Sequence, residues 1–217
     1  MFIKFSWLII KATLKMNNKE IQEQLMKGYF MQATKELLKG EGLKSLNVRN
    51  IAQQAGYSFA TLYNYFKDVK ELVFLCVEDF QKECAAEITQ KVNGIPSGPE
   101  KIKAITKAYM AYFVQYPSVF NLFFIEKLGD IGQKQPTANL IFTFLDRLTA
   151  EEWDYCRKEN NLAENEITKA KAELNFVTAG MLLFYMNRIQ PVSYKEFAQA
   201  IDIQIDAIVD RIEINKV

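Results

Sequence analysis

The chain of 217 residues is 49% hydrophobic and 24% charged, and its net charge is +1. This balance excludes a disordered protein, and the length suits one or two domains with a sizeable core. The sequence contains no histidine, and its three cysteines show no C-x-x-C spacing. We therefore expect no metal site and no cofactor, and we expect reduced thiols in a cytoplasmic protein.

Charge is distributed unevenly along the chain. Residues 1–75 contain 11 basic and 6 acidic residues, whereas residues 76–217 contain 16 basic and 20 acidic residues. A basic front followed by an acidic remainder is typical of a DNA-binding head on a body that does not bind DNA. Chance variation in composition is the alternative interpretation.

Residues 1–15 are apolar with interspersed lysines. The apolar run 5–10 is too short to span a bilayer, and the segment has no convincing signal-peptide cleavage site. We interpret residues 1–15 as a non-native or disordered extension, with translation starting at Met16, and we expect no membrane partner. An ordered extra arm or a membrane-surface contact is the alternative.

A first helix is predicted to begin at Asn18 and to end at Gly40 or Gly42. Its apolar residues recur every four positions, which predicts a buried face. They are Ile21, Leu25, Tyr29, Ala33 and Leu37.

The stretch 46–72 predicts two short helices joined by a tight turn, which is the helix-turn-helix arrangement. In the first helix, Val48, Ile51, Ala52 and Ala55 fall on one face. Asn47 can cap its start. A glycine, residue 56, follows at the point where a left-handed residue usually ends a helix.

The second helix of this unit can be capped by Ser58 and buries Leu62 and Phe66. Its outward side is left free, as in a recognition helix that enters the major groove. That side consists of Phe59, Ala60, Tyr63 and Asn64.

At these residues the sequence resembles the tetracycline-repressor (TetR) family of bacterial transcription regulators, over roughly residues 20–72. The matching positions are Gly42, Val48, Ile51, Ala52, Ala55, Gly56, Ser58, Thr61, Tyr63, Tyr65, Phe66, Glu71 and Leu72. Two positions depart from the family pattern. Ala60 stands where the family often has Gly, and Val69 stands where it usually has a phosphate-contacting Lys. Lys67 and Lys70 are the nearby cations.

The resemblance implies binding of double-stranded DNA through this unit. Arg49, near a helix start, suits a phosphate contact, and Asn64 can read adenine. Phe59 and Ala60 can meet thymine methyls. Tyr65 either contacts phosphate, as the family suggests, or packs against the first helix. The full predicted set is Asn47, Arg49, Ser58, Phe59, Ala60, Thr61, Tyr63, Asn64, Tyr65, Lys67 and Lys70.

Helical patterns continue through the rest of the chain, with capping boxes at 68–71 and 193–196. The predicted helices cover about 69–92, 99–115, 118 onward, 137–158, 164–188 and a last one after 193, with loops at 93–99 and 129–136. No β alternation of useful length occurs. The predicted fold is all-α, with nine or ten helices. We expect a DNA-binding domain over 16–68 and a helical effector-binding and dimerisation domain over 69–217.

The two last predicted helices carry apolar surface for a homodimer. The final helix has a stripe of Phe197, Ile201, Ile205, Ile208 and Ile212, and the helix before it contributes Ala172, Leu174, Ala179, Gly180, Met181 and Leu183. The resemblance implies that two helices from each subunit form a four-helix bundle. Ordinary packing within one chain would use the same residues and is the alternative.

Many aromatic residues lie between the connecting helix and the last two helices. Aromatic walls suit a pocket for a small hydrophobic or amphipathic effector, although such residues at helical spacing also form plain core. The predicted lining is Tyr109, Tyr112, Phe113, Tyr116, Phe120, Phe124, Phe142 and Trp153.

The sequence therefore favours a ligand-responsive repressor that binds a palindromic operator as a homodimer. The alternative is a helical small-molecule-binding or interaction protein with a weakened DNA-binding head. An enzyme is not expected, because the chain lacks histidine, a glycine-rich phosphate loop and a nucleophile elbow. We interpret Glu151, Glu152 and Asp154 as a solvated face.

Overall fold

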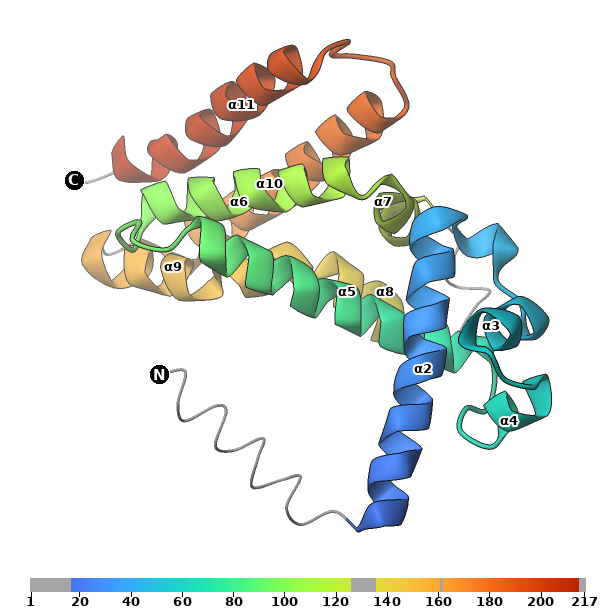
Figure 1. The fold of residues 1–217 in the computed structure, drawn as a ribbon. Coiled ribbons are helices and arrows are strands. Elements are labelled where there is room, and N and C mark those ends of the chain that lie inside the picture. Colours follow the sequence, from blue (N-terminus) through green and yellow to red (C-terminus); the bar gives the residue numbers. More distant parts are fainter. Residues whose placement is uncertain (1–16, 126–135, 161, 215–217) are drawn as a thin grey trace. The chain divides into compact units, whose positions relative to one another are not determined.

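The computed structural model describes residues 17–125, 136–160 and 162–214 (Figure 1). Residues 1–15, for which we expect an extension, lie outside this part. The described chain divides into two compact units, with the division between Cys76 and Val77. We call the unit up to Cys76 the head and the unit from Val77 the body.

The described residues form helices and connecting turns, with no strand among them, which confirms the all-α prediction. The head contains α2 (Asn18–Gly40), a 3-10 turn (Leu43–Ser45), α3 (Val48–Ala55), α4 (Phe59–Tyr63) and the start of α5 (Val69–Lys91). The body contains the rest of α5, α6 (Pro99–Gln115), α7 (Pro117–Phe124), α8 (Pro136–Phe142), α9 (Phe144–Asn160), α10 (Glu164–Met186) and α11 (Tyr194–Ile214).

Side-chain caps define several helix starts. The predicted box at α11 is confirmed, since the Glu196 N–H donates to Ser193 Oγ and the Ser193 N–H donates to the Glu196 carboxylate, both at 3.2 Å. At α5 the Glu71 N–H donates to Asp68 Oδ1 at 2.9 Å. Glu71 then accepts from the Lys67 N–H at 2.8 Å, one residue before the expected donor. The box at α5 is therefore a variant of the predicted one.

The predicted buried face of α2 is wrong in its N-terminal half. Leu25 and Tyr29 are 55% and 50% exposed, whereas Phe30 is fully buried. A strict spacing of four drifts by about 40° per step around a helix of 3.6 residues per turn, so the stripe leaves the core. The observed core face of α2 is Phe30, Ala33, Thr34, Leu37 and Leu38.

Phe30 occupies the centre of the head core. Its ring lies 6.3 Å from that of Phe66 in an edge-on arrangement, and 5.7 Å from that of Tyr57. The remaining buried members of this cluster are Leu37, Ile51, Leu62 and Leu72. Aromatic pairs in these geometries add to the free energy of burial, so α2, α3, α4 and the start of α5 share one apolar centre.

The predicted helix 137–158 is two helices, α8 and α9, which meet at Thr143. The Thr143 hydroxyl donates to the carbonyl of Asn139 at 2.8 Å. Such a bond back to the preceding turn bends helices, which gives a physical reason for the interruption. Periodicity alone did not reveal it, because the apolar pattern continues across the bend.

In the body, α6 contacts α9, α10 and α11. The apolar stripe of α11 faces inward, with Phe197 and Ile205 fully buried and Ile201 and Ile208 each 6% exposed. The side chain of Ile212 lies outside the described residues. The four described residues are therefore core within one chain, and assigning part of this stripe to a subunit interface is wrong for them.

A row of ion pairs joins α6 to α11 beside this core. Lys103 contacts Asp210 at 2.5 Å, and Lys107 contacts Asp202 at 2.9 Å and Asp206 at 3.5 Å. Burial disfavours the charge on Lys103, but hydrogen bonds to Asp210 and Glu100 outweigh it and raise the pKa of this lysine.

Glu152 fastens the loop that precedes α6, and its side chain is only 4% exposed. Its carboxylate accepts from the buried Gly98 N–H at 2.9 Å and pairs with Lys101 at 2.7 Å. The predicted solvated face is therefore wrong for Glu152, whereas Glu151 and Asp154 are exposed. The three acidic residues point in different directions around α9, and only two of them reach solvent.

No helix within the described residues is long and apolar enough to cross a membrane. Within the same part of the chain, no group of three or more His, Cys, Asp or Glu side chains is placed to hold a metal ion.

Candidate DNA-binding surface and body cavities

The turn between α3 and α4 has the predicted geometry. Gly56 adopts a left-handed conformation with φ of 77°. Its N–H donates to the carbonyl of Gln53 at 3.1 Å, and the Tyr57 N–H donates to the carbonyl of Ala52 at 2.9 Å. These two bonds form the Schellman motif that ends a helix.

We expect Gly56→Ala to lower the free energy of unfolding by about 1 to 2 kcal/mol, the cost of a left-handed backbone for an L-residue. A Cβ at this position would meet no atom within 4 Å, so crowding adds nothing. Urea denaturation followed by far-UV circular dichroism measures the change. Gly40→Ala, at a glycine whose φ is not positive and whose Cβ also meets nothing, should not destabilise the protein. Equal losses in the two variants would contradict this account.

Two predicted caps hold the helix-turn-helix. Asn47 Oδ1 accepts from the Asn50 N–H at 2.9 Å, which confirms the cap of α3. Ser58 Oγ accepts from the Thr61 N–H at 3.1 Å and lies 2.9 Å from Thr61 Oγ1, which confirms the cap of α4. These side chains, assigned to DNA contacts from the sequence, thus have a structural role within the head.

The outward side of α4 consists of exposed side chains that the head core does not use. Phe59 is 58% exposed and Tyr63 is 53% exposed, and Ala60 is also exposed. Asn64 is exposed as well and forms the C-cap of α4, which ends at Tyr63. On the opposite side Leu62 is fully buried, as predicted. Large apolar side chains that face solvent on one short helix mark a surface for a partner.

The remaining predicted DNA-contacting residues differ in exposure. Arg49, Lys67 and Lys70 are exposed. Tyr65 is half-buried, with its ring 6.3 Å from that of Phe30, and this packing is the alternative that the sequence left open. Val69, which stands in place of the family's lysine, is also half-buried and packs against the head core.

The sequence did not single out Tyr57 as a surface residue. Its ring stacks on that of Tyr29 with a centroid distance of 6.0 Å, and both side chains are exposed, at 39% and 50%. This pair places two aromatic rings beside the turn that leads into α4. Tyr57 stands between Gly56 and Ser58 in the turn, where the sequence pattern indicates an exposed side chain. Its partner Tyr29, however, belongs to the α2 stripe that was predicted to be buried.

The aromatic residues predicted to line a pocket are mostly packed against one another in the body. Phe113 lies 4.9 Å from Tyr109 and 5.2 Å from Phe124, centroid to centroid. Tyr109, Tyr112, Phe113, Phe120 and Trp153 are buried, Tyr116 and Phe124 are half-buried, and Phe142 is 64% exposed. Their role in ligand binding stays a prediction.

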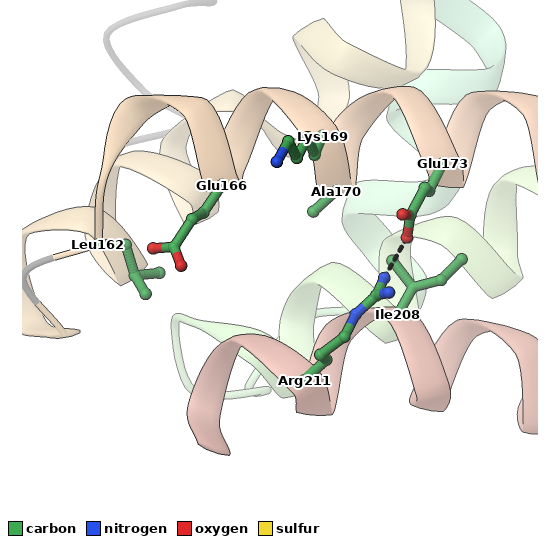
Figure 2. A pocket seen from close by; sticks show the side chains of 7 residues that line it. All are labelled: Leu162, Glu166, Lys169, Ala170, Glu173, Ile208 and Arg211. Atoms are coloured by element: carbon green, nitrogen blue, oxygen red, sulfur yellow. Dashed lines mark hydrogen bonds and ion pairs between the residues drawn. The ribbon is translucent and has the colours of Figure 1, made fainter. Parts of the chain in front are cut away.

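Cavities lie elsewhere in the described part of the body. One, of about 210 Å³, lies between α10 and α11 (Figure 2). Figure 2 shows Glu173 of α10 paired with Arg211 of α11 across it, with Glu166 and Lys169 farther along α10. Two acidic and two basic side chains line this cavity, so its charges balance.

The second cavity, of about 270 Å³, lies between α5, α8 and α9. We call it the α5–α9 cleft. It is lined by Glu78, Gln81, Lys82, Ala85, Leu140, Phe144, Arg147 and Leu148. Four of these are apolar and two are cationic, against one acidic residue, so this cleft carries a net positive charge.

The three cysteines, Cys76, Cys84 and Cys156, are buried thiols. Burial, with a smaller contribution from Glu87, raises the pKa of the Cys84 thiol far above its usual range. A thiol that remains protonated is a poor nucleophile and a poor redox sensor.

Comparison with known proteins agrees with this arrangement. Residues 30–76 match the sequence profile of bacterial regulatory proteins of the tetR family. A TetR family transcription regulator from Marinobacter aquaeolei VT8 shares 13% identity with a TM-score of 0.59, over 87% of this chain and 97% of that chain. FadR from Bacillus subtilis, in complex with stearoyl-CoA, shares 13% identity with a TM-score of 0.64, over 83% and 96% of the two chains. The fatty acid degradation regulator FadR from Bacillus halodurans shares 14% identity with a TM-score of 0.64, over 84% and 94%.

At these identities the solved structures show a shared fold. The profile match covers α3, α4, the C-terminal part of α2 and the start of α5, the segment in which the structure places the helix-turn-helix. The family match and the all-α fold thus support the same conclusion. Residues 30–76 are similar to bacterial regulatory proteins of the tetR family, and the described helices share the fold of solved members of that family.

Proposed function

We propose that the protein is a ligand-responsive transcriptional repressor of the cytoplasm, which binds a palindromic operator as a homodimer and releases it when a small effector binds the body. The observation that carries this proposal is the outward side of α4. Phe59 and Tyr63 are more than half exposed there, although the same helix contributes a fully buried leucine to the head core. A recognition helix has this division between a buried and a DNA-facing side.

We expect Arg49→Ala and Tyr63→Ala each to weaken binding to all DNA sequences by about threefold to tenfold, because each side chain contacts phosphate. Arg49→Ala should also make binding less dependent on salt, since one phosphate contact is lost. Mobility-shift titrations at several salt concentrations, with DNA from the protein's own upstream region, measure both effects.

The matched control is Arg157→Ala, because Arg157 is an exposed arginine on α9 of the body. It should bind DNA like the wild type. Tyr63→Phe separates the hydroxyl from the ring, and we expect it to reproduce the loss if the hydroxyl donates to phosphate. Unchanged binding in Arg49→Ala and Tyr63→Ala would overturn the roles assigned to them.

The homodimer interface that we propose lies on the exposed side of α10. Phe176 is 70% exposed, Phe184 is 52% exposed and Leu183 is 41% exposed. Positions 176, 180, 183 and 184 recur at helical spacing on one face, with Gly180 between the large side chains. Ile203 of α11 is 66% exposed and can extend this surface. Exposed apolar surface of this kind is typical of subunit contacts.

We expect Phe176→Asp to convert a dimer into a monomer at micromolar concentration, because the variant buries a carboxylate in an apolar contact. Size-exclusion chromatography with light scattering gives the mass. Phe142→Asp is the matched control, since Phe142 is also largely exposed but lies on α8. A wild-type monomer, or a dimer that survives Phe176→Asp, would contradict the proposed interface.

The effector that we propose is small and hydrophobic or amphipathic. The solved structure of FadR from Bacillus subtilis holds stearoyl-CoA, and its fold is similar to that of this chain. Effector binding must favour an arrangement of the heads that no longer fits the operator, and a tenfold loss of operator affinity corresponds to about 1.4 kcal/mol of coupling.

A helical binding protein with a weakened DNA-binding head is the second candidate. The position at which the family usually has a phosphate-contacting lysine is Val69, and its side chain packs against the head core. The same mobility-shift titration separates the two candidates, because this one predicts no specific shift of the upstream DNA. If Val69 limits the grip on phosphate, Val69→Lys should strengthen binding.

A further inference from the structure

The α5–α9 cleft combines an apolar wall with a polar end. Leu140 of α8, Leu148 of α9 and Ala85 of α5 line it, and all three are half-buried. Phe144 supplies a buried ring beneath them. A wall of half-buried aliphatic side chains gains free energy when an aliphatic chain covers it. At about 30 Å³ per water molecule, a volume of 270 Å³ holds about nine waters, which is room for a short chain with a polar head.

Arg147 provides the anchor at the polar end of the cleft. Its Nη2 donates to Gln81 Oε1 at 2.7 Å and to the carbonyl of Leu140 at 2.9 Å, and its guanidinium carbon lies 5.5 Å from the centre of the Phe144 ring. Within the described residues, Nη1 and Nε of Arg147 have no hydrogen-bond partner. The guanidinium is thus held in position by one nitrogen while the other two remain for a ligand.

Lys82 adds a second positive charge to the lining of the cleft. Its side chain is exposed and has no ion-pair partner among the residues that the structure describes. Glu78 is the single acidic residue of the lining, so the cleft carries one net positive charge. That charge matches a monoanion, and a carboxylate is the planar monoanion that an arginine binds best.

We propose that the α5–α9 cleft binds a small amphiphile with a carboxylate head, the head on Arg147 and Lys82 and the aliphatic chain along Leu140, Leu148 and Phe144. The effector is thereby given a binding site and a charge. Only the identification of this ligand as the effector rests on the proposed function.

Gln81 connects this cleft to the helix that continues into the head. It is 4% exposed, accepts from Arg147 and donates through Nε2 to the carbonyl of Leu140 at 2.9 Å. A carboxylate on Nη1 and Nε can leave both Nη2 bonds in place, and its bonds to the guanidinium join two charged groups and are the stronger ones. Binding therefore places a charged ligand beside the contacts that join Gln81 of α5 to α8 and α9, and α5 is the helix that begins in the head at Val69.

Calorimetric titration of the full chain with octanoate and with octan-1-ol tests the proposal, since the two probes share a chain and differ in charge. We expect octanoate to bind the wild type about tenfold more tightly than octan-1-ol. Arg147→Met should weaken octanoate binding by about tenfold and leave octan-1-ol binding nearly unchanged. Ala85→Leu, which fills the cleft and leaves Arg147 in place, should weaken the binding of both probes.

Arg157→Gln is the control, because it removes an exposed arginine of the same helix outside the cleft. Circular dichroism establishes whether each variant is folded. If Arg147→Met does not fold, Ala85→Leu still tests the proposal. The proposal is overturned if octanoate does not bind, if both probes bind the wild type equally, or if the Ala85→Leu variant binds octanoate as the wild type does. DNA binding is titrated separately without a probe. A protein that binds DNA but not octanoate defeats this inference alone, and the reverse result defeats the proposed regulator alone.

Discussion

Phe30→Ala should lower the free energy of unfolding of the head by about 3 to 5 kcal/mol, the usual cost of emptying the space of a buried phenylalanine. Phe30 is fully buried, and its ring touches those of Tyr57, Tyr65 and Phe66. These contacts join α2 to the turn before α4 and to the segment after it. Small domains are stable by about 5 to 15 kcal/mol, so at the lower end of this range the loss unfolds a large fraction of the heads and DNA binding falls with it.

Urea denaturation followed by far-UV circular dichroism measures the loss, and amide hydrogen exchange in α3 and α4 locates it in the head. Leu25→Ala is the matched control, because Leu25 lies on the same helix but is 55% exposed. We expect that control to change the free energy of unfolding by less than about 0.5 kcal/mol. If both variants unfolded at the same urea concentration, Phe30 would not be the centre of the head core.

Glu152→Ala should destabilise the body by about 3 kcal/mol, the lower end of the cost of breaking a buried charge pair. The substitution leaves the buried Gly98 N–H without its acceptor and Lys101 without its partner. Lys101 is 25% exposed and can turn toward water, which keeps the cost at the lower end. Gly98 itself cannot be replaced easily, since its φ is 115° and a Cβ would lie 3.3 Å from Tyr155.

Glu152→Gln distinguishes the hydrogen bond from the charge. The amide oxygen of glutamine can still accept from Gly98, so we expect about half the loss. Glu151→Ala, at the exposed neighbouring position, is the control and should have little effect. Thermal denaturation of the variants gives the ranking, and exchange of the Gly98 amide proton reports the bond directly. A Glu152→Ala variant as stable as Glu151→Ala would remove the assigned role.

The head was the more predictable part of the chain because its determinants are local. A cap such as Ser58, a left-handed glycine such as Gly56 and a buried leucine such as Leu62 act within one or two helical turns. The body was less predictable, because burial there depends on contacts between distant segments. Nothing near Glu152 in the sequence shows that Gly98, 54 residues earlier, supplies a buried N–H.

The stripe on α11 illustrates the same limit. Phe197, Ile201 and Ile205 have the spacing of a helix that meets another apolar surface, and both a partner subunit and α6 satisfy that requirement. The structure places them inside the chain, and the exposed apolar residues instead include Phe176 and Phe184, whose face carries fewer branched aliphatic residues. The α5–α9 cleft was missed for a related reason, since Gln81, Leu140 and Arg147 come together only after three helices pack.

The reactivity of the buried cysteines reports how often the helices around them separate. An alkylating reagent must reach the sulfur of a cysteine and reacts with its thiolate form. Burial of Cys76, Cys84 and Cys156 prevents this access while the surrounding helices stay packed. Labelling at each site therefore proceeds at the rate at which the surrounding helices part, multiplied by the chance of reaction before they close. Cys76 is the last residue of the head, on α5, whereas Cys84 and Cys156 lie in the body. Mass spectrometry of a labelling time course thus compares how often each of the two units opens locally, with no engineered probe in the protein.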